Sequence, residues 1–99
     1  MQFSNSQVMM NDMEKEVFIR HLDSVYGAVS EEYRLCAEGK GSYNANQLKM
    51  ILSELRSMKY WLNHRAFAPY YPRGIADDWQ RDDLLGAKLM KLSDEYWKL

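Results

Sequence analysis

The sequence predicts an all-α protein, a long antiparallel helical hairpin followed by a third, C-terminal helix in the manner of a three-helix bundle. Apolar residues recur every three or four positions along most of the chain, which is the spacing of one helical face. No run of alternating polar and apolar residues, bounded by turn residues, indicates a strand. A chain of 99 residues has room for one core, so we expect a single helical domain over residues 1–99.

The first helix is expected over residues 12–38. Asn11 with Glu14 resembles a capping box at its start, and Gly39 and Gly41 supply the left-handed conformation that ends helices. The apolar stripe that defines it consists of Met10, Met13, Val17, Phe18, Leu22, Val25, Val29, Tyr33 and Cys36.

Two other features of the N-terminal region predict close packing. Gly27 lies inside the expected helix at a cost of about 1 kcal/mol relative to Ala, which indicates a bend or the close approach of another helix, and we favour the close approach. Methionine fills irregular apolar contacts well, so we interpret the methionines that crowd the start of the chain as packing residues, with alternative translation starts as the other explanation. They are Met1, Met9, Met10 and Met13.

The second helix is expected over residues 45–67. Asn44 with Gln47 forms a second cap signature, and Pro69 prevents the helix from continuing. The link over residues 39–42 is short, so the first two helices are predicted to be antiparallel neighbours. The apolar stripe of the second helix consists of Leu48, Ile51, Leu52, Leu55, Met58, Leu62 and Ala66.

The third helix is expected over residues 78–97, after a loop over residues 68–77. Asp77 and Asp78 stand at its start, where the helix dipole favours carboxylates. Its apolar stripe consists of Leu85, Leu89, Leu92 and Tyr96, with Trp79, Leu84 and Trp97 on the flanks.

The number of cysteines and the lack of long apolar runs indicate the cellular compartment of the protein. Cys36 is the one cysteine, so an internal disulfide is impossible and a secreted disulfide scaffold is excluded. The start of the chain lacks the pattern of a secretory signal, and no stretch has the length of a membrane span. We therefore expect a soluble, cytoplasmic protein that does not bind membranes.

The sequence contains no recognisable catalytic, metal or cofactor motif. His21, His64 and Cys36 show no paired ligand spacing. A nucleophile with an adjacent base and an orienting group is likewise missing. We therefore predict a protein that is not an enzyme and that uses no metal or cofactor.

Charge is distributed unevenly although the net charge is −1. Residues 39–75 carry six bases and one acid, whereas the segments on either side are acidic. Dedicated nucleic-acid binders are usually far more cationic overall, so direct nucleic-acid binding is not expected. The alternative to a ligand-binding role is that the basic face pairs with the acidic helices. This candidate basic face consists of Lys49, Arg56, Lys59 and Tyr60.

The segment over residues 67–74 combines aromatic rings, two prolines and an arginine on a short connection. Aromatic residues and arginine dominate binding hot spots, so this loop is the leading candidate for a protein contact. The alternative is that Phe67 and one of the tyrosines cover the open end of the bundle. The Ala68–Pro69 bond is in addition a candidate site for a prolyl isomerase. The proposed contact residues are Phe67, Pro69, Tyr70, Tyr71, Pro72, Arg73 and Trp79.

The chain's small size, its helical character and the loop from Ala68 to Pro72 resemble the anti-RecBCD protein 2 family of lambdoid phages. That resemblance implies a phage inhibitor or modifier of a host enzyme, acting in the host cytoplasm. It implies binding to the RecC subunit of the RecBCD helicase-nuclease, with an effect on DNA recombination. It carries over no catalytic residues, because such a protein acts by binding.

Two other functions are compatible with the residues. A helical oligomer could sequester a small nucleotide with Lys49, Arg56 and Tyr60. A structural subunit of a phage particle could use Trp61 and Trp97 as lattice contacts.

Overall fold

The computed structural model describes the backbone of residues 2–99 and the side chains of residues 13–99. Every regular element in this part of the chain is a helix, which confirms the all-α class. The elements number four instead of the three expected: α1 (Gln2–Ala37), α2 (Ala45–Trp61), α3 (Tyr71–Asp78) and α4 (Leu84–Trp97).

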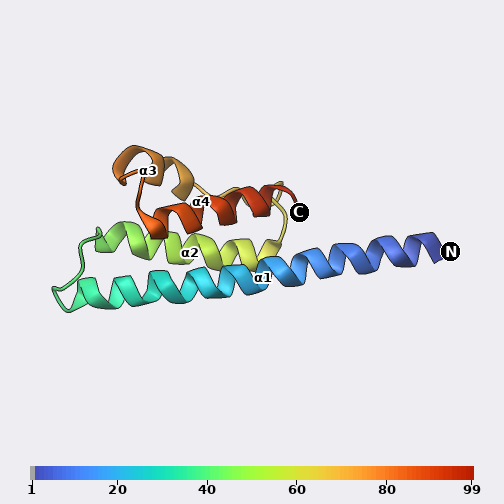
Figure 1. Ribbon diagram of the computed structural model, residues 1–99, viewed down its shortest axis with the longest axis horizontal. Coiled ribbons are helices and arrows are strands. Elements are labelled where there is room, and N and C mark those ends of the chain that lie inside the picture. The colour runs from blue at the N-terminus through green and yellow to red at the C-terminus, as the bar shows by residue number, and fades with distance from the viewer. Residues whose placement is uncertain (1) are drawn as a thin grey trace.

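The helices α1 and α2 run antiparallel and form the expected hairpin (Figure 1). Helix α4 packs on this hairpin, mainly against α1, and the short α3 lies over α2 and α4. The N-terminal part of α1 projects beyond the other helices, so the molecule is elongated, with extents of 57 × 23 × 23 Å.

The core lies between the four helices and uses most of the apolar positions that the sequence indicates. The whole stripe of α4, from Leu85 to Tyr96, is buried, as are the central positions of α1 and α2. The core residues are Phe18, Leu22, Val25, Val29, Leu48, Ile51, Leu52, Leu55, Met58, Tyr71, Ile75, Leu85, Leu89, Leu92 and Tyr96.

Helix α1 differs from the expected first helix at its start. It begins at Gln2, so the helix runs through Asn11 and Glu14 and the capping box there is wrong. Met13 is 62% exposed, so it does not pack into the core. The side chains of Met1, Met9 and Met10 lie outside the described residues.

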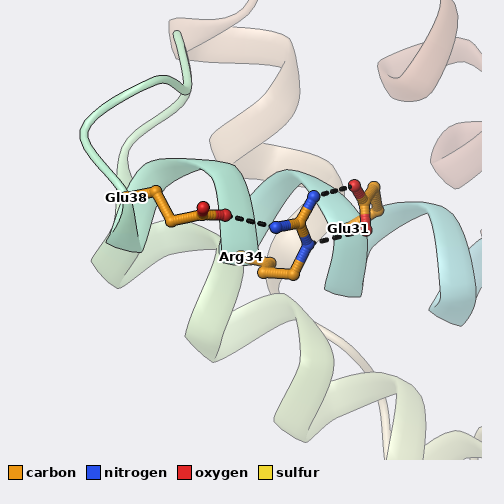
Figure 2. Close-up of polar contacts among 3 residues, drawn as sticks. All are labelled: Glu31, Arg34 and Glu38. Atoms are coloured by element: carbon orange, nitrogen blue, oxygen red, sulfur yellow. Dashed lines mark hydrogen bonds and ion pairs between the residues drawn. The ribbon is translucent and has the colours of Figure 1, made fainter.

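The end of α1 is close to the expected position. Gly39 adopts a left-handed conformation with φ 75°, which confirms it as a stop signal. Arg34 lies in the last turn of α1 and pairs with Glu31 and Glu38 (Figure 2). This cation suits the negative end of the helix dipole.

Helix α2 begins as expected and ends earlier than expected. The Asn44 side chain accepts a hydrogen bond from the backbone N–H of Gln47, 3.0 Å away, which confirms the cap. The helix stops at Trp61, because Leu62 turns into the left-handed region with φ 52°. The prediction of a helix to residue 67 is therefore wrong, and Ala66 is exposed instead of packing on the core.

The expected loop over residues 68–77 contains the helix α3, which sequence periodicity missed because it is only eight residues long. Pro72 lies in its first turn, where the missing N–H costs nothing. The last helix, α4, begins at Leu84 and not at residue 78, and Asp83 caps it by accepting from the Gly86 N–H. Asp77 and Asp78 therefore end α3 instead of starting α4.

Gly27 does not mark a close helix approach. The residue is exposed, and a Cβ added there would meet nothing within 4 Å. The expectation of close packing at this position is therefore wrong.

We expect Gly27→Ala to stabilise the protein by about 0.5–1 kcal/mol, because alanine has the higher helix propensity and restricts the unfolded chain. Urea unfolding followed by circular dichroism measures this change. Gly41→Ala is the contrasting variant, since a Cβ there would lie 2.8 Å from the backbone nitrogen of Cys36. It should destabilise the protein, and equal effects of the two changes would contradict this account.

Candidate functional site

The connection between α2 and α4 is held in place by a buried carboxylate. Glu54 lies on the core side of α2 and is only 8% exposed. Its two oxygens accept hydrogen bonds from the backbone N–H groups of Tyr70 and Tyr71, at 2.8 and 2.7 Å. These amides begin α3, which has no cap from its own N-cap side chain. Glu54 therefore caps α3 from another helix, where the helix dipole favours an anion.

Two buried tyrosines hold the rest of this connection. The Tyr71 hydroxyl donates to the carbonyl of Leu89 at 2.8 Å. The Tyr96 hydroxyl lies 2.9 Å from the carbonyl oxygen of Asn63 and 2.7 Å from that of Phe67, and donates between them. Burial raises the pKa of both phenols, and for Tyr71 the nearby Glu54 carboxylate adds to the effect.

Tyr70 and Arg73 are exposed on the segment that these hydrogen bonds hold in place. Tyr70 is 78% exposed, and Arg73 is exposed one short turn further along, where its backbone N–H donates to the Tyr70 carbonyl. Phe67, Pro69 and Pro72 are half-buried. The described residues contain no cis peptide bond, so the bonds preceding Pro69 and Pro72 are trans.

Tyr71 is not available as a surface contact. Its side chain is fully buried, so its ring belongs to the core and its role is to hold α3 against α4. This corrects the expectation that both adjacent tyrosines face a partner. The sequence could not separate Tyr70 from Tyr71, because only the helical register of α3 decides which of them points inward.

Trp79 lies at the opposite end of α3, half-buried against Tyr43, with 4.8 Å between the ring centroids. Its indole N–H donates to the Gln47 side chain at 2.8 Å. A cleft of about 500 Å³ opens beside these rings, and Ser42, Tyr43, Asn44, Gln47, Asp78, Trp79, Gln80 and Asp83 line it. Trp79 is thus separated from Tyr70 by the length of α3 and belongs to a different surface.

Tyr43 joins this cleft to the start of α4. Its hydroxyl donates to the Asp83 carboxylate, with distances of 3.0 and 2.8 Å to the two oxygens. Burial and this hydrogen bond raise the pKa of Tyr43 to about 12. Asp83 also caps α4, so this carboxylate serves two structural contacts.

The candidate basic face is partly engaged within the molecule. Lys59 forms an ion pair with Asp23 of α1 at 2.9 Å, and Arg56 donates to the Tyr26 hydroxyl at 2.8 Å. Lys49 and Tyr60 are exposed, so the four residues do not form one free surface.

Sequence reasoning missed Glu54, although the sequence carries a signal for it. Glu54 is the one acid among residues 39–75, and it falls three positions after Ile51 and four before Met58, on the apolar stripe. A lone charge at a core position is costly unless hydrogen bonds satisfy it, so its position alone could have indicated a buried cap.

The described residues contain no group of three or more His, Cys, Asp or Glu side chains placed to hold a metal ion. None of the helices described has the length and apolarity needed to cross a membrane. Comparisons with protein-family models, with curated proteins and with solved structures find no match to the chain.

Proposed function

We propose that this protein is a non-catalytic, protein-binding modulator whose contact surface centres on Tyr70 and Arg73. The observation that supports this is the exposure of Tyr70, which is 78% accessible although its backbone N–H is held by the buried Glu54 carboxylate. Tyrosine and arginine are among the residue types most enriched in binding hot spots.

The rigidity of the segment strengthens the proposal. Glu54 fixes the backbone of Tyr70, and Tyr96 fixes the turn that precedes it. A partner would therefore not have to order this loop on binding, which removes part of the entropic cost of association. A loop that served only to close the bundle would not need to leave a tyrosine in solvent.

The proposed partner is the RecC subunit of the RecBCD helicase-nuclease of a bacterial host. The size of the chain and the residues from Ala68 to Pro72 support this partner through their resemblance to the anti-RecBCD protein 2 family. The protein would then act as a phage-encoded modifier in the host cytoplasm. A prolyl isomerase at the Ala68–Pro69 bond is a proposed second partner.

We expect the double change Tyr70→Ala/Arg73→Ala to weaken capture of purified RecBCD by at least tenfold, since hot-spot truncations cost about 2 kcal/mol or more. Biolayer interferometry with the immobilised protein measures the affinity, and isolated RecC should bind as well as the whole complex.

The matched control is Tyr60→Ala/Arg56→Ala, because Tyr60 has the same 78% exposure on a different surface. This variant should bind like the wild type. Absence of binding to RecBCD would reject the partner. Binding that survives the Tyr70→Ala/Arg73→Ala change would reject the surface.

A further inference from the structure

A second cleft lies where α2 ends, on the surface of the molecule near the C-terminal end of α4. Its volume is about 410 Å³, within the range of small-molecule pockets. Side chains from α1, from the turn after α2 and from the end of the chain meet there. The lining residues are Lys15, Trp61, Leu62, Asn63, His64, Arg65 and Leu99.

Two aromatic rings, the exposed Trp61 and the half-buried His64, line this cleft, and two others pack against them. Trp61 is 52% exposed, and Tyr60 packs edge-on against it at 5.0 Å. His64 stacks on Trp97, with 4.3 Å between centroids and 30° between planes, and Trp97 is itself 49% exposed. Exposed aromatic side chains of this kind are the surfaces on which the bases of single-stranded nucleic acids stack.

The ionised side chains that line the cleft are both basic. Lys15 and Arg65 line it, and its lining includes no Asp or Glu side chain. Arg65 lies in a turn that a hydrogen bond stabilises, because its backbone N–H donates to the Asn63 side chain at 2.9 Å. A phosphate would therefore meet two cationic side chains, and the backbone that carries Arg65 is fixed by this turn.

The net charge of −1 for the whole chain does not reflect the local charge of residues 39–75. The single acid among residues 39–75 is Glu54, which is buried and bonded to the amides of α3. The outer surface of this segment consequently presents only basic charges. The molecule as a whole is weakly anionic, but this cleft offers two basic side chains to a phosphate.

We propose that this cleft binds an unpaired nucleobase together with its phosphate, either from single-stranded nucleic acid or from a free nucleotide. Trp61 and His64 provide the faces for the base, and Lys15 and Arg65 neutralise the phosphate. A paired base keeps its faces inside the duplex, so the cleft selects single strands over duplexes.

Fluorescence anisotropy with a labelled oligothymidylate tests the proposal, with unlabelled thymidine monophosphate and a DNA duplex as competitors. The wild type should bind the single strand and resist competition by the duplex. Trp61→Ala should weaken binding about five- to a hundredfold, the range for loss of one stacked base. Arg65→Ala should lower the slope of log affinity against log salt by about 0.7, the value for one phosphate of a single strand.

The control is Tyr70→Ala/Arg73→Ala, which removes an exposed ring and a cation from another surface and should leave nucleic-acid binding unchanged. Efficient competition by thymidine monophosphate supports the free nucleotide as the source of the base, and weak competition supports the single strand. Equal affinity for the duplex, or affinity that survives both Trp61→Ala and Arg65→Ala, would overturn the proposal. So would the absence of any binding, and none of these results bears on RecC capture.

Discussion

Replacing Glu54 with Ala is expected to lower the free energy of unfolding by about 3–4 kcal/mol. The change leaves the part-buried amide of Tyr70 and the buried amide of Tyr71 without acceptors, and a hydrogen bond to a charged group contributes about 1.5–3 kcal/mol. Glu54→Gln should cost about 2 kcal/mol, because one side-chain oxygen remains while the new NH2 group faces an N–H donor.

Thermal unfolding followed by circular dichroism measures both changes, and for a domain of this size the Ala variant should melt about 12–32 °C lower. The matched control is Glu16→Gln, which neutralises an exposed carboxylate of α1 and should shift the midpoint very little. A Glu54→Ala variant as stable as the control would show that Glu54 does not cap α3.

The second large effect is a loss of stability at alkaline pH. An unfolded tyrosine ionises near pH 10, whereas folding raises the pKa of Tyr43 to about 12 and also raises the pKa values of Tyr71 and Tyr96. Above pH 10 the unfolded chain releases protons that the folded chain retains. The stabilisation is therefore complete below pH 10 and is lost as the pH rises above 10. For Tyr43 the loss extends up to about pH 12, with a limiting slope of about 1.4 kcal/mol per pH unit.

Urea unfolding between pH 8 and pH 11.5 measures how the free energy of unfolding depends on pH. The variant Tyr43→Phe isolates the contribution of Tyr43 to this dependence. At pH 8 the variant should lose about 1 kcal/mol, because the hydrogen bond to Asp83 is gone. Its stability should then fall less steeply with pH, so that it equals the wild type near pH 11.

The control for the alkaline measurement is Tyr60→Phe, whose ring is 78% exposed. Its stability curve should run parallel to that of the wild type over the whole range. Parallel curves for Tyr43→Phe and the wild type would contradict the link between Tyr43 and alkaline unfolding.

The sequence determined the parts of the fold that depend on long periodic patterns. The stripe from Leu85 to Tyr96 and the central positions of α1 and α2 are buried as the three-and-four spacing predicts. The two helix ends at Asn44 and Gly39 also follow from local chemistry. The Asn44 side chain accepts a backbone N–H of the first turn of α2, and Gly39 adopts the left-handed conformation that ends α1.

Local patterns were insufficient where a helix end is decided by a distant residue. The sequence predicted that the second helix extends to residue 67, but α2 ends at Trp61. In the turn that follows, the Tyr96 hydroxyl of α4 donates to the carbonyl oxygens of Asn63 and Phe67. In the same way, α3 forms inside an expected loop because Glu54 supplies its cap from α2.

By itself, the sequence determined an all-helical chain with a core-facing stripe on each long helix and an aromatic, proline-rich connection. The tertiary structure alone decided which rings of that connection are free. Tyr71 turns inward to the Leu89 carbonyl and Tyr70 turns outward, because the helical register of α3 is set by a carboxylate sixteen and seventeen residues away in the sequence. Contacts over that distance leave no periodic trace, since they depend on how the helices pack.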